Sequence, residues 1–104
     1  MAPPRLSSGR WRGYYAQLGA RHPQDVALEF ADGIIRGDGR DDIGTFAIDG
    51  EYRADGDEVR VGWIKTYDGA HSVLYLGALR DRGIEGTWSL HGLAGSFALA
   101  PPDA

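Results

Sequence analysis

Apolar and polar residues alternate in short runs along most of the chain, and this alternation constrains the fold more than any other feature. In residues 10–17, Trp11, Tyr15 and Gln17 fall on one face and the arginines on the other. A period of two is typical of a β-strand that buries one face. No segment shows the sustained period of 3.6 that marks an amphipathic helix. The sequence therefore predicts an all-β protein.

Turn signals that contain glycine separate these runs. The chain of 104 residues holds 16 glycines without a triplet period, and Asp32-Gly33 is a strong hairpin signal because glycine readily adopts a positive φ. We expect residues 19–24 to form a loop, broken by Pro23. We expect roughly eight strands: two in the hairpin 58–79, and the others at residues 10–17, 25–30, 33–39, 43–54, 83–91 and 96–100.

Short connections between successive strands favour sequential antiparallel pairing. Eight antiparallel strands in a meander can close into a barrel, which removes exposed edges and leaves room for one small ligand. We therefore predict an antiparallel eight-stranded up-and-down β-barrel over residues 9–100. Residues 1–8 are expected to be a flexible lead-in and residues 101–104 a tail. A two-sheet sandwich is the alternative architecture.

Composition narrows the possible partners. The formal net charge of −4 lacks the basic footprint of a nucleic-acid-binding protein, and we interpret Arg5, Arg10 and Arg12 as a solvated strand face. The absence of cysteine excludes disulfides and a cysteine nucleophile. No apolar run approaches the ~20 residues of a membrane helix, and the first residues do not resemble a signal peptide. We expect a cytoplasmic protein without a nucleic-acid or membrane partner.

The hairpin 58–79 holds the densest set of groups that could contact a ligand. Trp63, Lys65 and Tyr67 share one face of its first strand. A lysine is rarely buried unpaired, so Lys65 is expected to reach solvent at the barrel mouth or to meet an anionic ligand. Large aromatic residues fit either a core or a pocket wall, and small-molecule sites combine apolar walls with few polar groups. The predicted ligand-binding residues are Trp11, Tyr15, Gln17, Trp63, Lys65, Tyr67, Ser72 and Trp88.

The second strand of this hairpin is apolar on both faces, whereas a half-buried strand normally has a polar outer face. If Leu74 and Leu76 point inward, Val73 and Tyr75 form an outward patch beside Ile64. Exposed apolar patches usually mark interfaces. We predict a homodimer or higher homo-oligomer, with an interface at Ile64, His71, Val73 and Tyr75.

Catalytic and metal-binding interpretations have less support. Residues 37–44 combine three aspartates with glycines, but the segment lacks the closing Glu and the helices of an EF-hand, and a polar hairpin loop accounts for it. His71 has no positioned partner for general-base chemistry. Neither a nucleophile elbow nor a P-loop is present. We predict no catalytic residue, no metal site and no cofactor.

The sequence resembles the avidin and streptavidin family of biotin-binding barrels. The similar residues are Trp63, Tyr67 and Ala70-His71-Ser72 in the family's fifth and sixth strands, Ile84, Thr87, Trp88 and Leu90 in the seventh, and Ser8-Gly9, Trp11 and Gln17-Leu18-Gly19 in the first. The resemblance implies an up-and-down barrel with a ligand pocket at one end. It implies that Trp63 and Trp88 are pocket walls and that the Ser72 hydroxyl meets a ligand heteroatom.

Several positions depart from the family's biotin contacts. Ala16 and Ala20 replace an asparagine and a serine, Leu74 replaces a threonine, and Leu76 replaces an aromatic residue. Because each lost polar partner costs roughly 1–3 kcal/mol, these departures predict that tight biotin binding is absent. The first functional hypothesis is thus a non-enzymatic small-molecule-binding barrel. The second is a structural or protein-interaction module with a filled core, and the third is a barrel isomerase or lyase.

Overall fold

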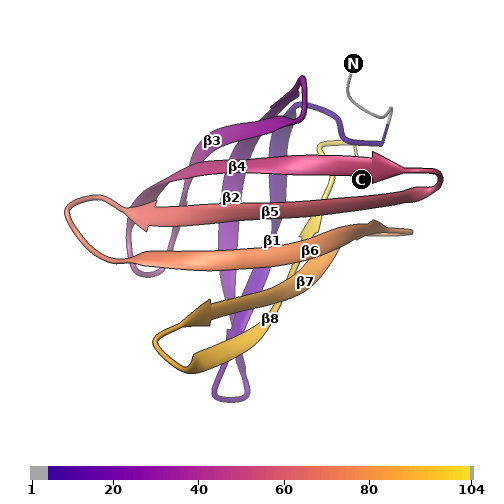
Figure 1. The fold of residues 1–104 in the computed structure, drawn as a ribbon. Helices are drawn as coiled ribbons and strands as arrows, with labels where there is room; N and C mark the ends of the chain where they lie inside the picture. The colour runs from indigo at the N-terminus through magenta and orange to yellow at the C-terminus, as the bar shows by residue number, and fades with distance from the viewer. Residues whose placement is uncertain (1–4, 104) are drawn as a thin grey trace.

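Eight antiparallel strands follow one another around a closed barrel in the computed structural model, which describes residues 5–103 (Figure 1). Each strand pairs with its neighbours in sequence, and β1 also pairs with β8, which closes the ring. The strands are β1 (Gly9–Gln17), β2 (Ala20–Ala31), β3 (Ile34–Asp41), β4 (Thr45–Asp55), β5 (Glu58–Tyr67), β6 (Ser72–Arg80), β7 (Gly83–Leu90) and β8 (Leu93–Ala100). The predicted all-β, up-and-down barrel is confirmed. The described residues contain no helix that could cross a membrane.

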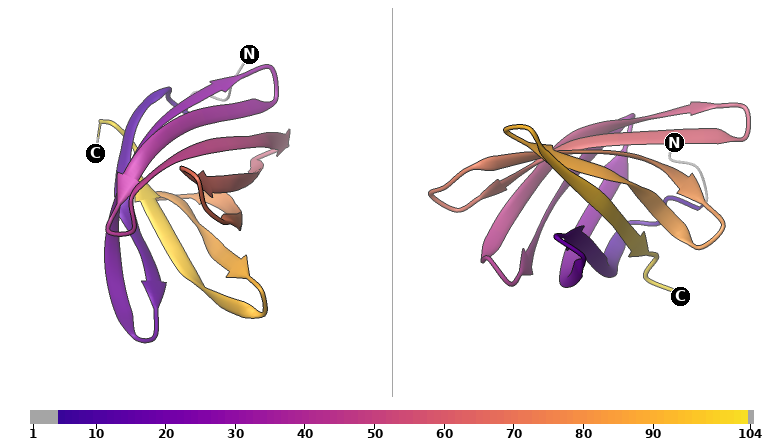
Figure 2. Two further views of the ribbon diagram at one scale, coloured as in Figure 1. Left: turned by 90° about the vertical axis from the view of Figure 1, so that its left-hand side faces the viewer. Right: turned by 90° about the horizontal axis from the view of Figure 1, so that it is seen from below.

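Because the strands run alternately up and down, successive hairpins lie at alternate ends of the barrel. The hairpins after β1, β3, β5 and β7 lie at one end, which we call the mouth (Figures 1 and 2). The remaining hairpins and both ends of the described chain lie at the opposite end. Side chains near the ends of these strands can therefore meet at the mouth although they are far apart in sequence.

Alternate side chains fill the barrel interior. Three aromatic rings lie together inside it: the ring centroid of Tyr75 is 5.7 Å from that of Trp63 and 4.7 Å from that of Phe97. Aromatic pairs at such distances stabilise a core beyond their buried area alone. The interior also includes Leu6, Trp11, Tyr15, Val26, Leu28, Phe30, Ile35, Phe46, Ile48, Val59, Val61, Tyr67, Val73, Leu79, Ile84, Trp88 and Leu99.

The loop expected at residues 19–24 is wrong from residue 20 onward: Gly19 lies in the β1–β2 turn, but residues 20–24 are the start of β2. Gln24 is the first residue of β2 that pairs with β3, whereas Pro23 pairs only with Tyr14 of β1. A proline lacks the N–H of a ladder, but it is tolerated where the ladder on one side has ended. The strand continues through Pro23 for this reason, and it brings His22 and Gln24 to the mouth.

Part of the predicted lead-in packs against the barrel. Residues 1–4, and residue 104 of the predicted tail, lie outside the described residues. Leu6 is buried, the Trp11 indole N–H donates to the Ser7 carbonyl at 2.9 Å, and the Phe30 backbone N–H donates to the Ser8 hydroxyl oxygen at 3.0 Å. Residues 5–8 therefore cover the core at the end opposite the mouth.

The predicted turn at Asp32 and Gly33 is confirmed. Their φ angles are 52° and 81°, as a two-residue type I′ hairpin requires. The same pattern recurs at Leu18 with Gly19 and at His91 with Gly92. In each pair the glycine takes the second left-handed position, where a side chain would be strained.

We predict that Gly13→Ala destabilises the barrel strongly. A Cβ at position 13 would lie 1.8 Å from the carbonyl oxygen of Ala98 on β8, so the strands that close the barrel would have to separate. We expect a loss of about 2 kcal/mol or more in urea unfolding. Gly62→Ala is the matched control. Its Cβ would lie 3.1 Å from the flexible end of Leu76, which can shift, and 3.8 Å from the Tyr75 carbonyl oxygen, so no backbone has to move. Equal losses for the two variants would contradict the explanation.

Candidate functional site

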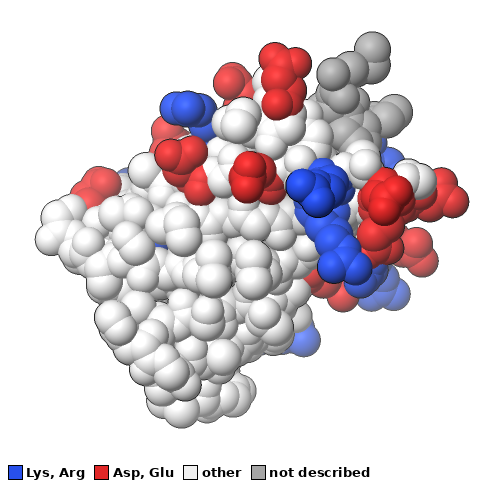
Figure 3. All heavy atoms as spheres, viewed as in Figure 1, with Lys and Arg blue, Asp and Glu red and all other residues white. Residues whose placement is uncertain are grey.

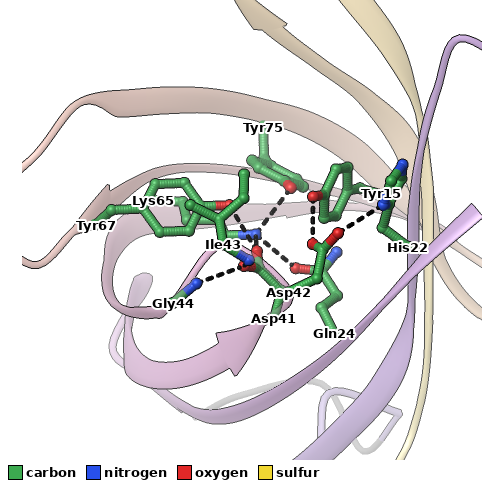
Figure 4. Close-up of polar contacts among 10 residues, drawn as sticks. All are labelled: Tyr15, His22, Gln24, Asp41, Asp42, Ile43, Gly44, Lys65, Tyr67 and Tyr75. Carbon is green, nitrogen blue, oxygen red and sulfur yellow. Dashed lines mark hydrogen bonds and ion pairs between the residues drawn. The ribbon is translucent and has the colours of Figure 1, made fainter.

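Lys65 lies inside the barrel near the mouth and has no exposed surface (Figure 4). The alternation of β5 buries it together with Trp63 and Tyr67. Its ammonium group donates to Asp41 Oδ2 at 2.5 Å, to Gln24 Oε1 at 3.0 Å and to the Tyr75 hydroxyl at 3.2 Å. An ammonium group has three protons, so every donor of Lys65 is used inside the protein. The expectation that Lys65 reaches solvent at the mouth is wrong.

Asp41, the last residue of β3, provides the counter-charge. Its Oδ2 accepts hydrogen bonds from Lys65 and, at 2.6 Å, from the Tyr67 hydroxyl. Its Oδ1 accepts from the backbone N–H groups of Ile43 at 2.8 Å and Gly44 at 3.3 Å. One carboxylate thus joins the buried lysine to the β3–β4 turn, and both of its oxygens are occupied (Figure 4).

Aromatic rings surround the Lys65 ammonium group. Nζ lies 4.2 Å from the ring centroid of Phe46 and 5.0 to 5.2 Å from those of Tyr15, Tyr67 and Tyr75. Ring faces attract a cation, and more strongly where water is excluded. Burial lowers the pKa of Lys65, and the hydrogen bond and charge of Asp41 oppose that change. The rings and the carboxylate together replace the hydration that the ammonium group lost.

A second polar group lies beside this buried pair, nearer to solvent. The Tyr15 hydroxyl donates to Asp42 Oδ1 at 2.5 Å, and His22 Nδ1 lies 2.7 Å from Asp42 Oδ2. The Tyr15 and His22 rings stack with their centroids 4.8 Å apart. Burial raises the pKa of Tyr15, and Asp42 raises it further. Burial alone would raise the pKa of Asp42, but the hydrogen bonds from Tyr15 and His22 bring it below its usual value.

Burial also raises the pKa values of Tyr67 and Tyr75. For Tyr67 the hydrogen bond to Asp41 is the next cause, and for Tyr75 it is the negative charge of Asp41. The Gln24 side chain opposes these effects and lowers the pKa of Tyr75. Both hydroxyls are therefore held protonated, as donors or as neutral partners of Lys65.

The sequence missed Gln24, Asp41, Asp42 and His22 as members of this cluster. The polar residues around Pro23 resemble a loop although they form the first residues of β2, and the aspartates of residues 37–44 have the composition of a polar hairpin loop. One signal could have identified Gln24: it shares its parity with Val26 and Leu28, which predicts an inward side chain.

The predicted pocket walls are core side chains. Trp11, Tyr15, Trp63 and Trp88 are all buried, and the Trp88 indole N–H donates to the Ala16 carbonyl at 2.8 Å. Gln17 ends β1 at the mouth and is half-buried. Ser72 points outward, where its hydroxyl lies 2.9 Å from that of Thr66. The interior position expected for Ser72 is wrong because outward residues of β5 and β6 pair there.

The faces predicted for β6 are also reversed. Val73 and Tyr75 are 7% and 2% exposed, whereas Ile64, Leu74 and Leu76 are 42%, 38% and 53% exposed. Tyr75 pairs directly with Trp63 on β5, and residues paired across two strands share a face. Burial of Trp63 therefore fixes Tyr75 inside. Of the predicted interface residues, Ile64 and His71 remain on the surface, with the His71 ring 5.0 Å from that of Tyr67.

Within residues 5–103, no three His, Asp or Glu side chains are grouped as they would be around a metal ion. The aspartates of residues 37–44 point in different directions: Asp41 is buried, Asp42 contacts Tyr15, and Asp38 is exposed. Comparison of the chain with protein-family models, curated proteins and solved structures finds no match. The site is therefore interpreted from its geometry alone.

We predict that the Lys65–Asp41 pair is strongly coupled. Lys65→Met leaves a buried carboxylate without its cation, and Asp41→Asn leaves a buried ammonium group without its anion. Each single change should cost about 3–5 kcal/mol in urea unfolding. The double variant should cost clearly less than the sum, because neither charge remains unpaired. Additive losses in this double-mutant cycle would contradict the coupling.

Stability should fall steeply in alkali. Burial raises the folded pKa values of Tyr15, Tyr67 and Tyr75 above 10.0, the ordinary pKa of a tyrosine. Their contribution is therefore present below about pH 10 and lost as the pH rises past it. The lowered pKa of Lys65 acts in the opposite sense below about pH 10.5. Urea unfolding between about pH 8 and 11 should show a shallower alkaline decline for Tyr67→Phe than for the parent chain. A steeper decline would contradict this assignment.

Proposed function

We propose that the chain is a non-enzymatic protein-interaction module built on a filled barrel, and that its function lies on the outer surface. One observation carries this proposal: the polar side chains that the sequence predicts as ligand contacts bind other groups of the protein. Lys65 and Tyr67 both contact Asp41, and Ser72 faces outward. A small-molecule site needs polar groups that converge on free space.

The surface hollows lie on the outside of the barrel. A hollow of about 840 Å³ follows β1, β2 and β3, and another of about 760 Å³ follows β3 to β6. Most of the residues that line them are exposed. The outside also holds exposed aliphatic side chains, among them Ile64, Leu74 and Leu76. Clustered apolar residues on an outer face favour an interaction role.

The charge distribution supports the same proposal. In the view of Figure 3 the part of β6, β7 and β8 nearer the mouth shows no charged side chain, whereas charges gather over β4 and towards the end opposite the mouth. Arg80 of β6 and Glu85 of β7 are among the exposed charged residues. Depletion of charged residues is typical of the central part of a protein–protein interface.

We also propose, at the level of the fold, a kinship with the avidin-like barrels. The closed up-and-down order of eight strands and the inward Trp63 and Trp88 support it. The position of Ser72 does not support a biotin-type site, because its hydroxyl lies on the opposite side of the sheet from these rings. The proposed kinship therefore concerns architecture and not ligand.

A ligand titration tests the filled barrel. Calorimetry with biotin, and fluorescence with an apolar dye, should show no saturable one-to-one binding to the folded chain. The intrinsic fluorescence of the buried tryptophans should likewise stay unchanged. Trp88→Phe keeps an aromatic ring near the mouth but removes part of its volume and the indole donor to Ala16, and it should leave the titrations flat. Saturable binding to the parent chain that Trp88→Phe weakens would overturn the proposal and favour a ligand-binding barrel.

A further inference from the structure

The outer face of β1, β2 and β3 carries positive charge although the chain as a whole is acidic. Its outward charged side chains are Arg10, Arg12, Arg21, Arg36 and Arg40, against Asp25, Glu29 and Asp38. We call these eight residues the arginine face. Five arginines against three carboxylates give a net charge of +2, and since the whole chain has −4, the remaining residues carry −6. Positive charge is therefore concentrated on one side of the barrel.

Strand register brings three of these charges into one row. Asp25 on β2 pairs directly with Arg12 on β1 and with Arg40 on β3, and residues paired across strands share a face. Both carboxylate oxygens of Asp25 contact β1: Oδ1 lies 3.1 Å from Arg10 Nε, and Oδ2 lies 3.6 Å from Arg12 Nε. The Arg40 side chain is exposed, and within residues 5–103 no ion pair or hydrogen bond occupies it. One carboxylate thus serves two guanidinium groups and leaves the third without an anion.

The hollow of about 840 Å³ lies between these arginines. Arg10 and Arg12 line it from β1, and Arg40 lines it from β3. Between them β2 contributes only short side chains: Pro23, Asp25 and Ala27. Arg10 and Arg12 also line a smaller hollow of about 230 Å³ beside residues 101 and 102. A partner segment can therefore lie over β2 with guanidinium groups on both sides of it.

We propose that the arginine face binds an acidic segment of a partner protein, with a carboxylate of that segment held between Arg12 and Arg40. The two positions are two strand spacings apart, roughly 10 Å, which long arginine side chains can bridge through one carboxylate. Each guanidinium group has five N–H donors in a fork that fits a carboxylate. The ion pairs with Asp25 cost little to rearrange, because the side chains of Arg10 and Arg12 are 63% and 69% exposed. The inference rests on the proposed function and names the class of partner for it.

The acidic residues around the arginine face favour a short peptide over a larger polyanion. Asp41 and Asp42 also line the hollow, but Asp41 is bound to Lys65 and Asp42 to Tyr15. A nucleic acid or an anionic bilayer needs a broad basic surface. Such a partner would extend past β1 and β3 and meet the residues that carry the net charge of −6, which would oppose binding. A short acidic segment can place its charges over the arginines alone.

Fluorescence anisotropy with a labelled peptide of alternating glutamate and serine tests the site. A peptide of about six residues spans roughly 20 Å when extended, so it can follow β2 along the hollow. We expect saturable binding with a Kd of about 100 µM or tighter at about 50 mM salt. The Kd should rise at least about tenfold at about 500 mM salt, because exposed charges are screened. The same peptide with glutamine in place of glutamate should not bind.

Two pairs of variants separate the site from the overall charge. Arg40→Ala should weaken peptide binding about tenfold, as expected for the loss of one charge-assisted contact. Arg53→Ala removes the same charge from β4, outside the arginine face, and should change the Kd by less than about twofold.

Asp25→Asn should strengthen binding about threefold or more, because it removes the carboxylate that competes for Arg10 and Arg12. Asp55→Asn is its matched control at the exposed end of β4 and should leave the Kd within about twofold. Circular dichroism must show that all four variants are folded, as expected for changes at exposed or half-exposed positions.

Four results would overturn this inference: no binding at about 1 mM peptide, equal effects of Arg40→Ala and Arg53→Ala, equal effects of Asp25→Asn and Asp55→Asn, or tighter binding of a single-stranded DNA with the same number of charges. The DNA result would assign the arginine face to nucleic acid. None of these results would produce ligand binding inside the barrel. The proposed function would therefore fail separately, in the titration with biotin.

Discussion

The structure of the barrel at its mouth depends on the buried pair of Lys65 and Asp41. An ammonium group loses its hydration when it enters the interior, and the loss costs several kcal/mol unless partners replace the water. Here the partners come from β2, β3 and β6, through Gln24, Asp41 and Tyr75. Each of these strands must be placed correctly for the charge to be tolerated. The network around Lys65 therefore links β5 to β2 and β3, with which β5 shares no backbone ladder.

This requirement explains why the cluster is structural in character. A lysine poised for a ligand would keep at least one donor free, and a catalytic lysine would need access to a substrate. In this barrel Asp41 is bound from both sides, by Lys65 and Tyr67 at one oxygen and by the β3–β4 turn at the other. Apart from Nε2 of Gln24, which has no hydrogen-bond partner among the described residues, the charged groups and hydroxyls around Lys65 are paired. Such a network favours one arrangement of the core over its alternatives.

The alternation of the sequence predicted the barrel and the inward face of β5, because Trp63, Lys65 and Tyr67 share one parity. It did not predict the inward face of β6, since Val73 and Leu74 are equally apolar and periodicity cannot separate them. Only the pairing of Tyr75 with Trp63 decides between them, and pairing is a tertiary property. The partners of Lys65 could not be predicted for the same reason, since they too depend on how the strands pair. Asp41 and Gln24 lie far from Lys65 in sequence, on segments whose polar composition resembles loops.

The core network and the outer face are linked through the register of the strands. A slip of β5 by one residue would turn Lys65 outward and Ile64 and Thr66 inward, because successive side chains of a strand point to opposite faces. The hydrogen bonds of Lys65 oppose that slip from inside the barrel. They therefore also keep Ile64 outside, beside Leu74. The buried ammonium group of Lys65 thus determines which face of β5 and β6 carries the exposed apolar residues. The proposed function of the outer surface therefore depends on Lys65, although Lys65 is not itself on that surface.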